Sequence, residues 1–165
     1  MNSPYCGKFR VTQQFKTGHD GLDLVGIDSK EIHATISGTV QYSGWENASN
    51  HSQGFGQYVC VKGSDGKYYY YGHMSELKVK TGQIVAVTTV LGIEGSTGKS
   101  TGSHCHYCCR PAFRAGNAFN ITAISGIPNA LGTYNDGYKP PAQPELHSRI
   151  EIFIDGQRKY SGLLD

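Results

Sequence analysis

The sequence predicts a mainly β domain built from short strands and tight turns. Glycine is abundant, with 22 residues in a chain of 165, and there are 11 tyrosines. Glycine permits tight turns and tyrosine favours strands, so this mixture is typical of many short strands joined by turns. A chain of this length can bury a core of its own, and we expect residues 1–126 to form one domain.

Strand patterns recur along this domain, with turn residues between them. The predicted strands cover residues 9–15, 32–36, 39–42, 57–62, 67–74, 79–85, 90–93 and 103–110. The sequence Gly-Ser-Asp-Gly at 63–66 predicts a hairpin turn between two of them. Pro111 ends the last strand, because proline cannot donate a hydrogen bond to a sheet.

The pattern changes after Pro111. Residues 112–126 are weakly patterned and predict no more than a turn of helix. Residues 127–144 predict a linker, because their prolines restrict the chain to extended forms. Residues 145–165 predict a β-hairpin around an Asp-Gly turn, or the first part of a truncated second module.

Charge and hydropathy exclude several classes of function. The net charge is only +2 and is evenly spread, which gives no basis for nucleic-acid binding. No run of 18 apolar residues occurs, so we expect no membrane insertion. The first residues do not join a positively charged segment to an apolar one, so no secretory signal peptide is expected.

The five cysteines are an odd number, which excludes a complete set of disulfides. Cys105 and Cys108 are three residues apart, so on a strand they face opposite sides and do not bind one metal ion together. Cys105 and Cys109 share a face, but they are about 13 Å apart at roughly 3.3 Å per residue, too far for a disulfide. We expect Cys105 and Cys109 to be small core residues and Cys108 to lie near the face of the histidines.

Two pairs of candidate metal ligands stand far apart in the sequence. His104 and His106 alternate in a predicted strand, so their side chains point to one face. His19 and Asp23 are four residues apart, which also gives them one face in an extended segment. His73 ends a predicted strand between the two pairs. Imidazoles and one carboxylate are typical of a catalytic zinc site, which keeps one position open for water.

Two other histidines, His33 and His51, are expected to have structural or surface roles. His33 has only Glu31 as a nearby acid, so we expect a structural histidine. His51 lies in the polar, turn-rich segment 45–56 and is expected to be exposed.

Two other motifs suggest functions that the sequence does not support. Gly-Lys-Ser at 98–100 imitates the end of a phosphate-binding loop, but Ile93 stands where that motif needs its first glycine. The strand and turn repeat at 79–93 would fit a lipoyl-type carrier domain, but no lysine lies in an exposed turn of that kind.

Four motifs, in their order and spacing, resemble those of the lysostaphin-type zinc endopeptidases. They are Gly-His-Asp-Gly-Leu-Asp at 18–23, Tyr-Gly-His-Met-Ser at 71–75, Gly-Ser-Thr-Gly at 95–98 and Thr-Gly-Ser-His-Cys-His at 101–106. The resemblance covers residues 18–110 and includes the repeat at 79–92. It implies an antiparallel β domain of the duplicated hybrid motif type, and hydrolysis of peptide bonds in bacterial peptidoglycan.

The resemblance also implies a role for each candidate residue. His19, Asp23 and His106 would bind Zn²⁺, and His73 and His104 would be catalytic, with either one as the general base. The chain departs from the family between and after the two histidines. Cys105 stands where the family usually has an aliphatic residue, and Tyr107-Cys108 stands in place of Phe-Glu, which puts a thiol where a carboxylate is common. No clear tyrosine precedes His19, where some members of the family have one.

The implied partners are peptidoglycan peptides, and the implied location is the cell wall, the extracellular space or a virion. Residues 127–134 resemble the segment that follows such domains in some phage or prophage proteins. The alternative function is a wall-binding or hydrolase-regulating module without catalysis, for which the fold alone suffices. The presence of all five site residues favours the enzyme.

Overall fold

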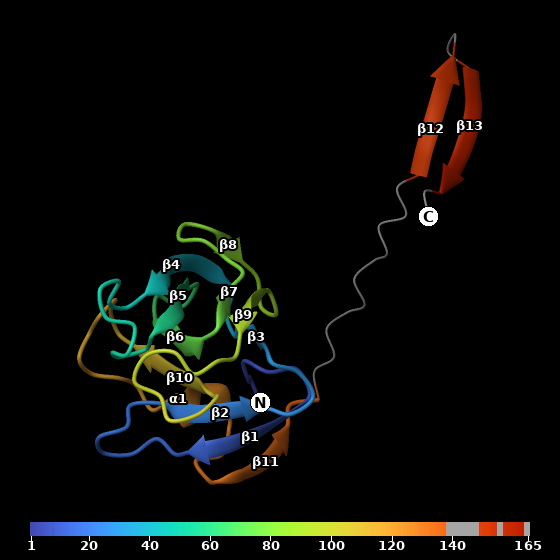
Figure 1. Ribbon diagram of the computed structural model, residues 1–165. Coiled ribbons are helices and arrows are strands. Elements are labelled where there is room, and N and C mark those ends of the chain that lie inside the picture. Colours follow the sequence, from blue (N-terminus) through green and yellow to red (C-terminus); the bar gives the residue numbers. More distant parts are fainter. Residues whose placement is uncertain (138–148, 155–156, 164–165) are drawn as a thin grey trace.

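The computed structural model describes residues 1–137, 149–154 and 157–163, and β-strands dominate it (Figure 1). The mainly β class predicted from the sequence is therefore confirmed. Among the described residues there is one helix, α1 (Ile121–Ser125). No helix in this part of the chain has the length and apolar character needed to cross a bilayer.

An eight-stranded antiparallel sheet forms the body of the domain, in the order β11-β1-β2-β10-β6-β5-β4-β8. Its strands are β1 (Lys8–Gln13), β2 (Leu22–Gly26), β4 (Gly38–Trp45), β5 (Gln57–Gly63), β6 (Tyr68–Met74), β8 (Ile84–Val85), β10 (Cys105–Arg110) and β11 (Gly132–Asn135). Strand β10 lies between β2 and β6, where five of its six residues are buried. The sheet therefore brings segments far apart in the sequence together around β10.

Two smaller sheets complete the described structure. The first has three strands in the order β3-β9-β7, namely β3 (Glu31–His33), β7 (Glu76–Leu77) and β9 (Val90–Ile93). The second is the antiparallel pair of β12 (Arg149–Ile154) and β13 (Gln157–Leu163). The predicted Asp-Gly turn at 155–156 and the predicted linker residues 138–144 lie outside the described residues.

The hairpin of β5 and β6 follows from its sequence. Gly66 has a φ of 80°, a left-handed conformation that glycine adopts without strain. Side chains alternate along β6, so Tyr69 and Tyr71 enter the main core while Tyr68 and Tyr70 join an aromatic cluster on the other face of the sheet. Strand alternation therefore accounts for the run of four tyrosines.

Residues 127–137 belong to the domain and are not part of a linker, which corrects the boundary expected at residue 126. Ile127 is 1% exposed and packs in the main core. Strand β11 then pairs with β1, with Gly132 opposite Val11. Proline and glycine indicated an extended chain here, but an extended chain can also be the edge strand of a sheet.

Three cysteines and two histidines lie where the sequence predicted, namely Cys105, Cys108, Cys109, His33 and His51. All five thiols are free, and Cys105 and Cys109 are buried in the main core. Cys108 packs on the opposite face, within 4.8 Å of ligand atoms of His106. His33 is buried beside the Pro4 carbonyl, and His51 is exposed and stacks on Trp45.

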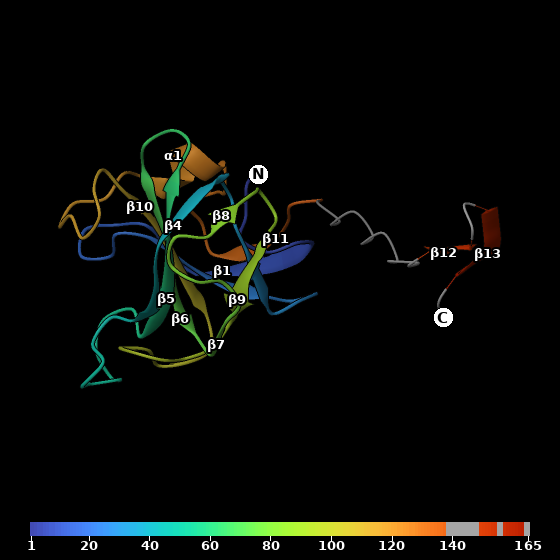
Figure 2. The ribbon, with the colours of Figure 1, turned by 90° about the horizontal axis from the view of Figure 1, so that it is seen from above.

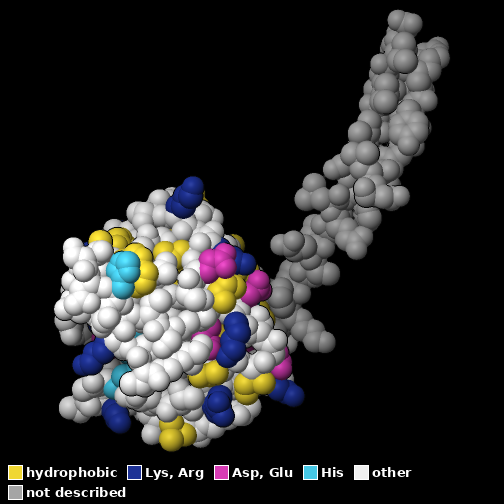
Figure 3. Space-filling model, in the orientation of Figure 1, with side chains coloured by type: hydrophobic (Ala, Val, Ile, Leu, Met, Phe, Trp, Pro, Cys, Tyr) yellow, Lys and Arg dark blue, Asp and Glu magenta, His cyan; other side chains and the backbone are white. Residues whose placement is uncertain are grey.

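Two loops meet at one end of the domain. The loop 46–56 after β4 and the loop 95–104 before β10 lie side by side in Figure 2. Two backbone hydrogen bonds join them, from Gly98 N to His51 O at 3.0 Å and from Lys99 N to Gly54 O at 2.9 Å. Basic and acidic side chains are interspersed on the face that Figure 3 shows, without a large patch of one sign.

A buried carboxylate, Glu94, fixes the base of the loop 95–104. It accepts hydrogen bonds from Tyr5 Oη at 2.6 Å, Gly26 N at 2.8 Å, Lys30 Nζ at 2.9 Å and Ser103 Oγ at 2.6 Å. Burial by itself raises the pKa of this carboxyl, but the donors outweigh burial and hold the pKa below its ordinary value. Glu94 therefore ties the N-terminal segment, β2 and the residue before His104 together.

Replacing Glu94 with glutamine should lower the free energy of unfolding at pH 7 by about 3 kcal/mol, because buried donors lose a charged acceptor. A carboxyl with a lowered folded-state pKa stabilises the fold above its unfolded pKa of about 4.3 and loses this contribution as the pH falls through its folded-state pKa. The difference between the wild type and Glu94→Gln in urea denaturation should therefore shrink in acid. An equal difference at neutral and acid pH contradicts this account, and the exposed Glu76→Gln should change neither value.

Candidate active site

The register of two neighbouring strands places Asp23 beside His106. Strand β2 pairs antiparallel with β10, and Asp23 and His106 are directly opposite each other. The distance from His106 Nδ1 to Asp23 Oδ1 is 2.9 Å. Both residues are buried, with 8% of His106 and 9% of Asp23 exposed, so the sheet holds them in place.

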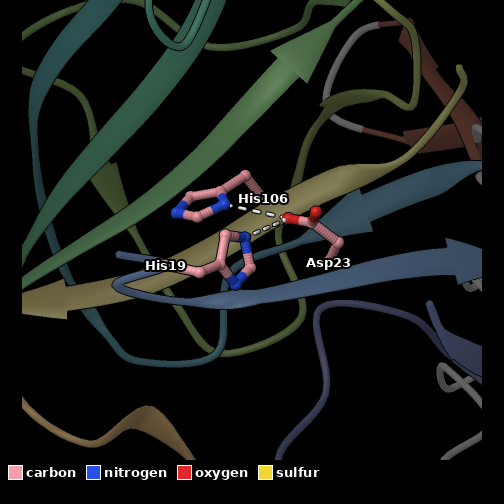
Figure 4. A group of neighbouring side chains, drawn as sticks. All are labelled: His19, Asp23 and His106. Carbon is pink, nitrogen blue, oxygen red and sulfur yellow. Dashed lines mark hydrogen bonds and ion pairs between the residues drawn. The ribbon is translucent and has the colours of Figure 1, made fainter. Parts of the chain in front are cut away.

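His19 reaches the same carboxylate oxygen from the turn between β1 and β2. Its Nε2 is 3.1 Å from Asp23 Oδ1, and its ring meets that of His106 edge to face with a centroid distance of 4.8 Å (Figure 4). The chain bends at Gly21 and is not extended throughout 19–23, as the sequence interpretation assumed. A Cβ at Gly21 would lie 2.7 Å from both His106 Nε2 and the Tyr107 carbonyl, so only glycine fits beneath the histidine.

The three predicted ligands offer a donor set that fits a zinc ion. His19 Nε2, Asp23 Oδ1 and His106 Nδ1 lie within 4.8 Å of one another. A tetrahedral zinc ion with bonds of about 2.0–2.1 Å needs ligand atoms about 3.4 Å apart, so small movements would suffice. The far nitrogen of each ring has an acceptor, since His19 Nδ1 is 2.8 Å from Gln14 O and His106 Nε2 is 3.1 Å from Asp20 Oδ1. When a metal ion is bound, the two nitrogens that face Asp23 Oδ1, His19 Nε2 and His106 Nδ1, would therefore present lone pairs to it.

Electrostatics adapt the site to a cation. Burial opposes charge on His106, but hydrogen bonds to Asp20 and Asp23 outweigh burial and raise the pKa of His106 well above its ordinary value. Burial likewise raises the pKa of Asp23, but hydrogen bonds with His106 and His19 bring it below its ordinary value. Without a metal, His106 therefore holds an extra proton between the carboxylates of Asp20 and Asp23. A metal cation bound at Nδ1 would replace that proton.

His73 and His104 face the same site from other elements. The residue His73 has a φ of 63° at the end of β6, an uncommon conformation for a residue other than glycine. Its Nδ1 is 2.7 Å from Thr97 O, and the Nδ1 of His104 is 2.8 Å from Gly102 O. Each ring therefore keeps a lone pair on Nε2, and the two ring centroids are 4.6 Å apart.

Their surroundings differ. Burial lowers the pKa of His73 to about 4, so this ring is neutral at pH 7. His104 lies nearer a carboxylate, with its Nε2 3.6 Å from Asp23 Oδ1. An imidazole with a free lone pair can accept a proton, which is the chemistry that the sequence predicted for His73 and His104.

A groove contains all five residues singled out in the sequence. Its volume is about 710 Å³, and its walls include β1, the loop 46–56 and the loop 95–104. The groove is lined by Gln13, His19, Asp23, Ser52, His73, Gly98, Lys99, Ser100, Thr101, His104 and His106. A second hollow of about 330 Å³ shares His73, Lys99 and His106 with it and continues to Phe55 and Arg110. An extended peptide could therefore lie across the site.

Comparison with known proteins identifies the family. The model of Peptidase family M23 matches residues 17–120, a range that includes all five predicted site residues. The chain belongs to peptidase family M23. This M23 chain is 32% identical over 90 residues to lysostaphin of Staphylococcus staphylolyticus, covering 54% of the chain and 18% of lysostaphin. It is 35% identical over 97 residues to the peptidoglycan DD-endopeptidase ShyC of Vibrio cholerae, covering 59% of the chain and 21% of ShyC.

Solved structures agree with this assignment. Lysostaphin from Staphylococcus simulans superposes with a TM-score of 0.60 and 26% identity, covering 70% of this M23 chain and 47% of that chain. The catalytic domain of the prophage-encoded M23 protein EnpA from Enterococcus faecalis also gives 0.60, with 29% identity and coverage of 72% and 94%. The lysostaphin-type fold predicted from the motifs is thus confirmed. The M23 chain spans about a fifth of the length of the curated relatives it matches.

Sequence reasoning missed two residues of the site, Asp20 and Arg110. Asp20 binds His106 through Oδ1 and binds Arg110 through Oδ2, which is 2.7 Å from the guanidinium. In a fully extended segment Asp20 would point away from His19, so the strand pattern gave no reason to choose it. The bend at Gly21 turns the Asp20 side chain toward His106. The one feature of the sequence that could have indicated Asp20 is its position as an acidic residue next to the candidate ligand His19.

Proposed function

We propose that this protein is a zinc metalloendopeptidase that hydrolyses peptide bonds in bacterial peptidoglycan. The observation that carries the proposal is the meeting of His19 Nε2 and His106 Nδ1 at Asp23 Oδ1, at 3.1 and 2.9 Å, inside an open groove. Membership of family M23 and the similarity to lysostaphin and to a peptidoglycan DD-endopeptidase support the substrate class. The catalytic domain in this proposal covers residues 1–137, and its place of action is the cell wall.

His19, Asp23 and His106 would hold the zinc. Bound zinc lowers the pKa of a water molecule to about 7 and polarises the carbonyl of the scissile bond. The fixed acceptors Gln14 O and Asp20 keep the two histidine ligands in the tautomers that present lone pairs to the groove. The single carboxylate ligand leaves the site positive, which favours the charge that develops on the carbonyl oxygen.

His73 and His104 would share the proton transfers. Each holds a proton on Nδ1 against a backbone carbonyl and presents Nε2 to the groove. One ring would accept the proton of the attacking water and pass it to the leaving amine, while the other, carrying a second proton taken from solvent, would hydrogen-bond to the oxyanion. Burial lowers the pKa of His73 to about 4, so that ring is neutral at pH 7 and its Nε2 lone pair is unoccupied.

The test is hydrolysis of purified peptidoglycan by the zinc-loaded protein. We expect new amino termini to appear, a chelator to stop their release, and added zinc to restore it. Sequencing the products of defined cross-linked fragments would identify the bond. Binding to peptidoglycan that resists chelation and yields no new amino termini would contradict the proposal and favour the wall-binding module.

A further inference from the structure

We propose that Asp20, held in place by Arg110, is a positioning residue that fixes the tautomer and orientation of His106 at the metal site. The inference rests on the proposed zinc site of His19, Asp23 and His106. It assigns a role to two residues that do not touch the metal position themselves.

Both oxygens of the Asp20 carboxylate have defined partners. Oδ1 is 3.1 Å from His106 Nε2, and Oδ2 accepts a hydrogen bond from Arg110 Nη2 at 2.7 Å. His106 lies on β10 four residues before Arg110, whereas Asp20 comes from the turn before β2. The carboxylate therefore joins two points of β10 and is oriented by both.

Arg110 is itself fixed, so Asp20 has a rigid support. Its Nη1 donates to the Ala115 carbonyl at 2.8 Å. Its guanidinium lies 5.2 Å from the ring centroid of Phe55 and 5.1 Å from that of Tyr70, and the side chain is 16% exposed. A planar guanidinium held by rings and a carbonyl presents its N–H groups in one direction.

The tautomer of His106 decides whether its Nδ1 is a ligand or a donor. Nδ1 is 2.9 Å from Asp23 Oδ1, so a proton on Nδ1 would bond to Asp23 and block two of the three zinc ligands at once. When zinc occupies Asp23 Oδ1, an ionised carboxylate at Nε2 would hold the ring proton on that nitrogen and leave the lone pair of Nδ1 for the metal. Cys108 also lies near His106, but its thiol is a weak acceptor and cannot replace the carboxylate.

The same geometry makes a cation at Asp20, His106 and Cys108 unfavourable, although their ligand atoms lie within 4.8 Å of one another. The Arg110 guanidinium is 2.7 Å from the Asp20 carboxylate and already neutralises it. A metal ion there would face that positive charge at short range. Asp20 is thus an outer partner of His106 and not a ligand.

The experiment measures zinc affinity of the full chain by competition with a chromophoric chelator. Asp20→Ala should weaken affinity by about 10–100-fold, the usual cost of losing the outer partner of a histidine ligand. Asp65→Ala removes a carboxylate in the turn between β5 and β6 and should leave affinity unchanged. An Asp20→Ala affinity within twofold of the wild type overturns the inference.

A second measurement separates positioning from a general loss of structure. In ¹⁵N spectra of the zinc-loaded protein, the His106 Nε2–H signal should exchange slowly with solvent in the wild type, where Asp20 accepts its hydrogen bond, and exchange faster in Asp20→Ala. If Asp20→Ala does not fold, Asp20→Asn replaces it, because the amide keeps the volume and an acceptor oxygen but loses the charge. An unchanged Nε2–H signal and affinity in the folded variant would refute the role of Asp20.

The outcomes for the inference and for the proposed function are distinguishable. A wild type that binds no zinc contradicts the proposed metal site itself. A wild type that binds zinc tightly, beside an Asp20 variant that binds equally well, contradicts only the positioning role.

Discussion

Replacing His106 with alanine should abolish zinc retention and hydrolysis together. The substitution removes one of three protein ligands and leaves Asp23 and His19 without their shared partner. The affinity loss should exceed the roughly 10–100-fold cost of removing an outer partner, because a direct bond to the metal is lost. Zinc content after gel filtration, measured beside release of amino termini from peptidoglycan, checks both effects.

Two further variants make this result specific. Asp23→Ala should behave like His106→Ala, since Oδ1 is the atom that both imidazoles approach. His51→Ala removes an exposed histidine that stacks on Trp45 outside the ligand set, and it should keep its zinc. One zinc ion per chain in purified His106→Ala would contradict the assignment of this ligand.

Replacing His104 or His73 with alanine should keep the zinc but reduce turnover by about 10²–10⁴-fold, the usual contribution of a general acid or base. Neither ring belongs to the proposed ligand set, and both present Nε2 to the groove. Zinc content and kcat on cross-linked fragments are the two measurements. Wild-type lysis by His104→Ala would refute its catalytic role, and loss of zinc in either variant would place that histidine in the ligand set instead.

The sequence alone singled out five residues that the structure brings together in one groove, because their motifs are local. His104 and His106 share a face through strand alternation, His19 and Asp23 are four residues apart, and His73 ends a predicted strand between the two pairs. The pairing of the strands could not be predicted from the sequence. Asp23 and His106 are 83 residues apart, and the register that puts them opposite each other comes from the packing of the whole sheet.

Residues whose role depends on a local departure from regular structure were missed for a physical reason. Asp20 contacts His106 because the chain bends at Gly21. The prediction of an extended segment at 19–23 did not include this bend. Arg110 was interpreted only as the end of a strand, although its guanidinium binds Asp20. Residues 127–137 were assigned to a linker from their composition, whereas pairing with β1 depends on an available strand edge.

X-ray absorption at the zinc edge of the loaded protein tests the central claim most directly. Coordination by His19, Asp23, His106 and water predicts only nitrogen and oxygen neighbours, at about 2.0–2.1 Å, with the signature of two imidazoles. A sulfur neighbour at about 2.3 Å would place Cys108 in the coordination sphere and contradict the proposed site.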